Sequence, residues 1–128
     1  MGFRNNKLEL SIKKKSDSAL THWVLQKISA IALLPLAIWF LYVFKDFVYQ
    51  NYDNKIIWMQ DITNSTLLTL FFLVTLFHLR LGLTVVVEDY IHNEKNKNLL
   101  LKIIAILCLL LAVFTVIVVF MISKGTNV

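Results

Sequence analysis

The chain has 128 residues and a formal net charge of +5, and 58% of its residues are hydrophobic. A soluble domain of this size usually stays near half apolar and mixes its apolar and charged residues. Here the apolar residues are instead gathered into uncharged blocks at residues 28–44, 62–79 and 103–123. Because about 20 apolar residues span a membrane, this pattern excludes an ordinary soluble domain and predicts an all-α membrane protein with three transmembrane helices.

The first segments in chain order are a basic tail and a membrane helix. Residues 1–20 are predicted to form a polar tail, with Ser16, Asp17 or Ser18 as the N-cap of the first helix. That helix is expected over about residues 21–46. Pro35 lies inside it, which a membrane helix tolerates when its neighbours satisfy the freed carbonyl.

The rest of the chain follows as two further helices of one transmembrane domain, residues 21–124. A short polar loop with aromatic residues is expected over residues 50–61, and the second helix over about 63–89. Residues 91–98 are strongly polar and predict a second loop, and the third helix is expected over about 99–124. Three helices enclose too little space for a substrate pathway, so we expect them to pack with a partner membrane subunit or to self-assemble.

The basic residues predict the orientation in the membrane. With three spans, the N-terminal tail and the second loop lie on the same side. That side carries nine of the basic residues: Arg4, Lys7, Lys13, Lys14, Lys15, Lys27, Lys95, Lys97 and Lys102. The other side carries three: Lys45, Lys55 and Lys124. The positive-inside rule therefore predicts an N-terminus in the cytoplasm or mitochondrial matrix and a C-terminus outside. Since topology explains these charges, nucleic-acid binding is not expected, and the single Cys108 is expected to be inert packing.

His78 is the residue of the second helix that most needs an explanation. An ionisable side chain within a membrane is costly and usually faces a partner or a cavity. At 100° per residue, Gly82 and Asp89 return to the same face as His78. A glycine one turn away would let a flat ring lie against the backbone, and a neutral imidazole is a common haem ligand. The alternative is a histidine hydrogen-bonded to a neighbouring helix, with Gly82 serving helix packing.

Other polar residues form a second set. Arg80 lies about 200° from His78 and is interpreted as snorkelling or pairing with a partner's acidic group. On the first helix, His22, Gln26 and Ser29 make a polar stripe, which we expect near the inner boundary at the level of Asp89. It is either an ordinary interfacial collar or a pocket for a headgroup or an anionic cofactor arm.

Two motifs carry a resemblance that covers nearly the whole chain. THWVLQKISAIALLPLAIWFLY at residues 21–42 and FHLRLGLTVVVEDYIH at residues 77–92 resemble the small hydrophobic anchor subunits of succinate dehydrogenase, the D subunits of complex II. The resemblance implies that His78 is an axial ligand of haem b and binds its iron. It implies that Tyr90, with Asp89 beside it, binds ubiquinone. It further implies contacts of Lys27 and His22 with the haem propionates or the quinone pocket.

The resemblance also implies the partners and limits the chemistry. The second haem ligand would come from the cytochrome b membrane subunit, and electrons would arrive from the flavoprotein through the iron–sulfur subunit. No catalytic residue for succinate oxidation is expected here, because the chain has no flavin-binding glycine motif and no cysteine cluster. We expect it in a bacterial or mitochondrial inner membrane. The alternatives are a fumarate reductase anchor or a non-redox accessory subunit of a transporter or channel.

Overall fold

The computed structural model describes residues 2–125, except for the side chains of residues 2–5 and 15. Within these residues the chain is entirely helical apart from short connections. It contains α1 (Gly2–Tyr49), α2 (Tyr52–Gln60), α3 (Ile62–Tyr90) and α4 (Glu94–Ser123). Three of them, α1, α3 and α4, are long and apolar enough to cross a membrane. The expected all-α class with three spans is therefore confirmed.

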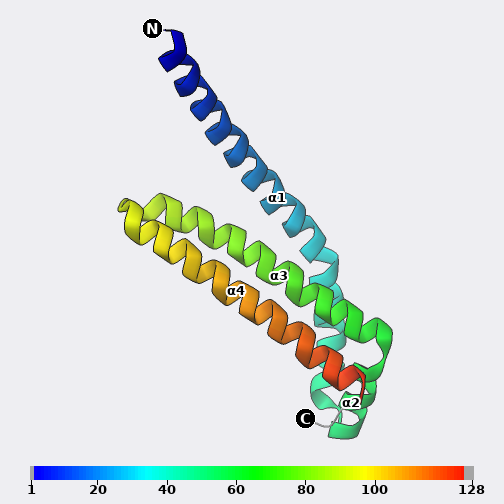
Figure 1. The fold of residues 1–128 in the computed structure, drawn as a ribbon. Coiled ribbons are helices and arrows are strands. Elements are labelled where there is room, and N and C mark those ends of the chain that lie inside the picture. Colours follow the sequence, from blue (N-terminus) through cyan, green and yellow to red (C-terminus); the bar gives the residue numbers. More distant parts are fainter. Residues whose placement is uncertain (1, 126–128) are drawn as a thin grey trace.

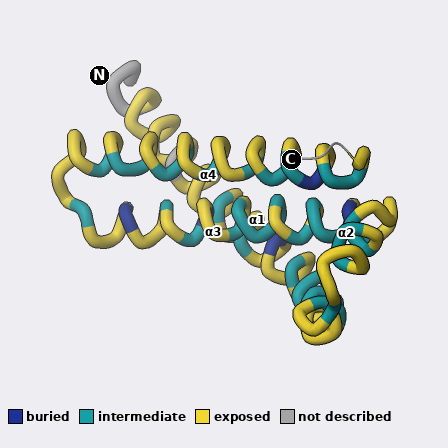
Figure 2. Tube along the Cα trace, turned by 90° about the horizontal axis from the view of Figure 1, so that it is seen from below, coloured by how far each residue is buried: buried dark blue, intermediate teal, exposed yellow. Residues whose placement is uncertain are grey.

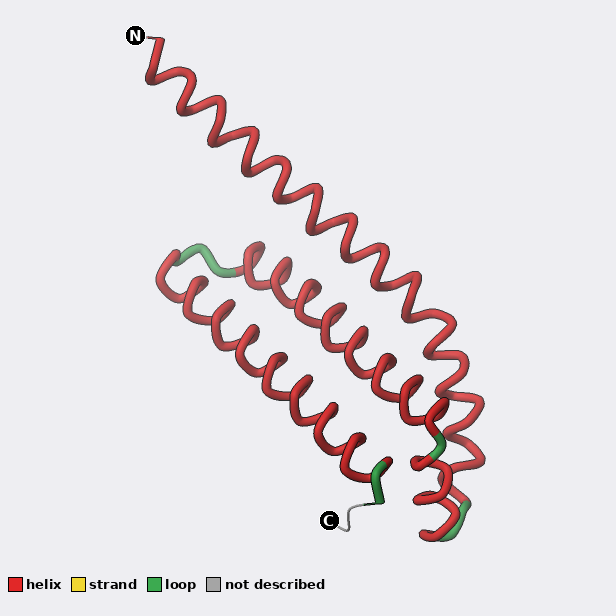
Figure 3. The backbone as a smooth tube through the Cα atoms, turned by 45° about the vertical axis from the view of Figure 1, so that its right-hand side comes forward, coloured by secondary structure: helices red, strands yellow, loops and turns green. Residues whose placement is uncertain are grey.

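Helix α1 begins much earlier than the sequence pattern indicated. It is continuous from Gly2, so the N-cap expected between Ser16 and Ser18 is wrong. The hydroxyl of Thr21 donates to the carbonyl of Asp17 at 2.8 Å, which is an ordinary contact inside a helix. The physical reason is that residues 3–34 contain neither glycine nor proline and are rich in good helix formers, so nothing ends the helix there. Figure 3 shows this helix as the longest segment of the chain, extending well beyond α3 and α4.

The connections are also more helical than expected. Residues 50–61 were predicted as a loop, but they contain α2, capped by Asn51, whose side chain accepts from the Asn54 N–H. Asp61 then caps α3. Only residues 91–93 separate α3 from α4, because Asn93 accepts hydrogen bonds from two backbone N–H groups and starts α4 at Glu94. Side-chain caps thus shorten both predicted loops.

Helix α3 lies between the other two long helices. Figure 1 shows α3 and α4 side by side and antiparallel, with α1 on the other side of α3 and its N-terminal part projecting away. Few side chains are buried within the chain, as the mostly yellow and teal tube in Figure 2 shows. The buried apolar residues are Leu81, Val87 and Val119. Because the apolar surface faces outward, it is suited to lipid or to a partner membrane subunit.

Aromatic side chains join α1 to α2 and α3. The rings of Phe40 and Phe71 stack with their centroids 4.5 Å apart. Trp58 of α2 stacks on Trp39 and meets the edge of Phe47. These contacts set the antiparallel register between α1 and α3, and that register decides which polar residues meet further along the two helices.

Candidate functional site

His78 meets a serine of the neighbouring helix. The Oγ of Ser29 on α1 lies 2.8 Å from the Nδ1 of His78 on α3. Ser29 is only 4% exposed, and its Oγ also lies 3.0 Å from the backbone carbonyl of Gln26. Among the residues that the structure describes, the Nε2 of His78 has no hydrogen-bond partner. The ring is thus held through one nitrogen while the other is left available.

Gln26 occupies the space that Gly82 opens one turn from His78. A Cβ at position 82 would lie 3.3 Å from the Nε2 of the Gln26 side chain. The Oε1 of that amide is buried and has no hydrogen-bond partner within the described part of the chain. The space beside the histidine, which the sequence suggested for a flat ring, is therefore taken by a flexible amide.

Ser29, the last residue of the polar stripe of α1, lies further from Asp89 than expected. Ser29 faces His78 rather than lying level with Asp89, which is eleven residues and about three helical turns further along α3. The expected level is therefore wrong for Ser29, whereas His22 borders the same cavity as Glu88, the neighbour of Asp89. The reason is the register of α1 on α3, which the hydropathy of a single helix does not specify.

His22 and Arg80, which the sequence left unrelated, border one cavity. Its volume is about 380 Å³. Its polar lining comes from α1 and α3: His22, Arg80, Thr84 and Glu88. Arg80 forms no salt bridge with any described residue. The cavity, whose lining Leu101 of α4 completes, therefore presents a guanidinium, an imidazole and a carboxylate from α1 and α3.

Lys27 lies apart from this set. Its ammonium group sits 3.9 Å from the centre of the Trp23 ring, and both side chains are exposed. At 100° per residue Lys27 is about 160° from Ser29 around α1. The structure therefore does not bring Lys27 to His78.

Asp89 and Tyr90 form the exposed end of α3. Tyr90 is 79% exposed, and α3 ends at this residue. Neither side chain has a hydrogen bond or ion pair with another described residue. Asp89 lies about 16 Å from His78 along the axis of α3. The two groups therefore form separate positions along one helix face.

The candidate metal ligands do not cluster in the part of the chain that the structure describes. The described residues contain no group of three or more histidine, cysteine, aspartate or glutamate residues able to hold an ion. Cys108 is a free thiol in α4. His78 is thus not part of such a group.

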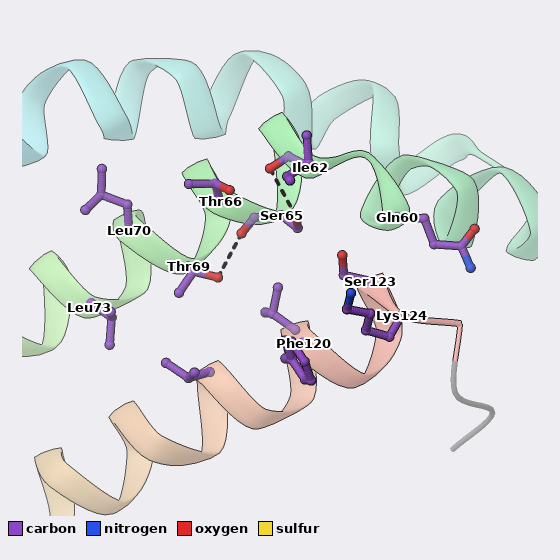
Figure 4. A pocket seen from close by; sticks show the side chains of 12 residues that line it. Gln60, Ile62, Ser65, Thr66, Thr69, Leu70, Leu73, Phe120, Ser123 and Lys124 are labelled. Carbon is purple, nitrogen blue, oxygen red and sulfur yellow. Dashed lines mark hydrogen bonds between the residues drawn. The ribbon is translucent and has the colours of Figure 1, made fainter.

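A second groove lies between α3 and α4 near the end of α4. Figure 4 shows the hydroxyl groups of Ser65 and Thr69 beside it, with Ser123 and Lys124 opposite. Ser65 donates to the Ile62 carbonyl and Thr69 to the Ser65 carbonyl. Both of these hydroxyl donors are therefore used within α3.

These features define an integral membrane protein with three spans, a half-buried histidine bonded to the neighbouring helix and an exposed acidic–tyrosine end. The family model described as "Succinate dehydrogenase/Fumarate reductase transmembrane subunit" matches residues 4–119. The chain therefore belongs to this family, which confirms the resemblance and the membrane location.

Individual relatives agree with the family match. The chain is 33% identical over 115 residues to the succinate dehydrogenase hydrophobic membrane anchor subunit of Rickettsia typhi, covering 85% of this chain and 90% of that protein. It is 32% identical over 101 residues to the succinate dehydrogenase membrane anchor subunit of Reclinomonas americana, covering 74% and 82%. No solved structure matches the chain significantly.

Proposed function

We propose that this chain is the membrane anchor subunit of a succinate:ubiquinone oxidoreductase in a bacterial or mitochondrial inner membrane. The observation that carries the proposal is the family match over residues 4–119, since it includes both motif regions. The family description covers succinate dehydrogenases and fumarate reductases, and the names of the relatives favour the former. The partners would be a cytochrome b membrane subunit, an iron–sulfur subunit and a flavoprotein, with the outward apolar faces packing on membrane subunits and lipid.

His78 is the proposed axial ligand of haem b. The available Nε2 fits this role, because Nδ1 is already engaged by Ser29 and metal-bound histidines usually use their other nitrogen for such a bond. A haem b held there supplies a one-electron redox centre inside the membrane.

Asp89 and Tyr90 are proposed to bind ubiquinone. Reducing a quinone requires protons at its oxygens, and a tyrosine hydroxyl at the end of a membrane helix can donate a hydrogen bond there. The exposure of Tyr90 and its lack of a partner fit a site completed by other subunits. Asp89 beside it would carry protons from water to the site.

His22 and Lys27 are proposed as weaker contacts of the same region. His22 borders the cavity that contains Arg80, so it is placed to meet an anionic group such as a haem propionate. Lys27 would reach such a group only by leaving the Trp23 ring. In the proposed orientation the N-terminus lies in the cytoplasm or matrix.

The test is the His78→Ala variant in the purified complex, with exposed His92→Ala as its matched control. The wild-type complex is expected to contain the three partner subunits by mass spectrometry and to show a Soret band. We expect His78→Ala to lose or shift this band, while His92→Ala leaves it unchanged. An unchanged band in His78→Ala would exclude the ligand role, and a complex without the partner subunits would exclude the anchor function.

A further inference from the structure

The contact between Ser29 and His78 is one half of a short chain of hydrogen bonds. The Ser29 Oγ has two neighbours, the Nδ1 of His78 at 2.8 Å and the carbonyl oxygen of Gln26 at 3.0 Å. A carbonyl oxygen can only accept a hydrogen bond, and a serine hydroxyl has one hydrogen to donate. The hydroxyl hydrogen of Ser29 and the N–H of His78 can therefore be arranged in one of two ways.

In the first arrangement Ser29 donates to Nδ1 of the imidazole. The hydroxyl then has no hydrogen left for the Gln26 carbonyl, and two oxygen acceptors face each other at 3.0 Å. In the second arrangement Ser29 donates to the Gln26 carbonyl and accepts the N–H of His78 Nδ1. Both contacts are then hydrogen bonds, and the carbonyl can still accept its helical N–H, since it has two lone pairs. Because Ser29 is buried, an unsatisfied contact there is costly.

We infer that Ser29 is a positioning residue that fixes the Nδ1–H tautomer of His78 through the Gln26 carbonyl and so leaves the Nε2 lone pair free for a metal ligand. A neutral imidazole has one protonated nitrogen, so holding the proton on Nδ1 makes Nε2 the acceptor. The bond also limits rotation of the ring about its χ angles. The tautomer is a property of this chain alone, whereas its use in binding iron rests on the proposed function.

A buried serine that bonds only its own helix provides a control for Ser29. Ser65 is its closest counterpart: it is 6% exposed and donates to the carbonyl three residues earlier, at 3.2 Å. It has no histidine partner. Ser65→Ala therefore removes the same kind of buried helical hydroxyl and serves as the matched control.

The first measurement reads the tautomer directly. The full chain is labelled with ¹⁵N in its histidine rings, reconstituted in lipid bilayers without haem and examined by solid-state NMR, with His78→Gln identifying the His78 signals. We expect His78 to be Nδ1–H in the wild type and in Ser65→Ala, and to gain the Nε2–H form in Ser29→Ala. A wild-type His78 in the Nε2–H form would overturn the inference without any variant, and so would an unchanged tautomer in Ser29→Ala.

The second measurement tests the consequence in the assembled complex. Loss of a partner of a metal ligand typically weakens metal binding 10- to 100-fold, so Ser29→Ala should retain haem less well and raise its midpoint potential. Ser29→Thr keeps a hydroxyl that can bond the same carbonyl and should restore both. Equal haem retention and potential in the wild type and Ser29→Ala would overturn the positioning role. A fixed tautomer in a complex without haem would instead refute only the proposed haem function.

Discussion

The side-chain amide of Gln26 on α1 lies against Gly82 on α3, in the space where any other residue would place its Cβ. The separation from that Cβ position would be 3.3 Å, which is tight but involves only the far end of a flexible side chain. Gln26 also supplies the carbonyl that holds Ser29, so one residue of α1 contributes to the surroundings of His78 with both its backbone and its side chain. The absence of a side chain at Gly82 therefore allows α1 to pack closely against α3, rather than leaving space for a ligand.

Substitution of Gly82 should have an effect that grows with side-chain size. Gly82→Ala requires a shift of a few tenths of an ångström in the Gln26 amide, so we expect an assembled complex with an unchanged haem spectrum. Gly82→Leu forces the helices apart and should cost about 1–3 kcal/mol, with loss of the Ser29 contact. The measurement is the thermal stability and the reduced-minus-oxidised spectrum of each purified complex. Equal behaviour of the two variants would contradict a packing role for Gly82.

Tyr90→Phe should impair quinone reduction without affecting the haem. The variant removes one hydroxyl from a side chain that is 79% exposed and has no hydrogen bond to another described residue, so folding should be unchanged. Loss of a positioned proton donor typically reduces the rate about 100-fold or more. The measurement is succinate:quinone reductase activity beside succinate oxidation by an artificial acceptor, which should stay normal. Tyr49→Phe, at a tyrosine of α1 that is 90% exposed, is the control. Full quinone reductase activity in Tyr90→Phe would remove this residue from the site.

The charge distribution predicts an orientation in the membrane, which can be measured with reporter proteins fused to the C-terminus. Alkaline phosphatase fused at the C-terminus should be active when expressed in a bacterium, whereas a green fluorescent protein fused there should be dark, because only an exported C-terminus gives this pair of results. Lys13→Gln and Lys14→Gln together should not invert the protein, since Lys95, Lys97 and Lys102 remain on the same side. A fluorescent C-terminal fusion would show that the proposed orientation is inverted.

The sequence predicted the features that depend on one helix at a time. Three apolar blocks and the placement of His78 with Asp89 on one face follow from composition and the 100° rotation per residue. The contact of Ser29 with His78 could not be derived in this way, because it depends on how far α1 slides along α3. The available signal was that a histidine among apolar residues needs a hydrogen-bond partner, and Ser29 offers a hydroxyl at the start of the uncharged block 28–44. The extension of α1 to Gly2 was missed because a polar, charged segment was interpreted as non-helical.

The aromatic contact of Phe40 with Phe71 should determine the register that places Ser29 opposite His78. These rings stack at a centroid distance of 4.5 Å, and Phe40 also meets the edge of Phe72. Within a membrane, helices associate through such packing rather than through exclusion of water. Phe40→Ala should therefore destabilise the α1–α3 contact by about 2 kcal/mol, less than the 3–5 kcal/mol typical of a fully buried ring, and Phe40→Leu by less.

This prediction is checked by the temperature at which half of the purified complex is lost at a fixed heating rate. Ile38→Ala, at a residue of the same helix that is 62% exposed, should change that temperature little and is the control. The same variants should follow the order wild type, Phe40→Leu, Phe40→Ala in the fraction of His78 that keeps its Nδ1–H tautomer. If Phe40→Ala lowered the stability but left the tautomer unchanged, the register at His78 would be set by its own contact with Ser29 and not by the aromatic rings.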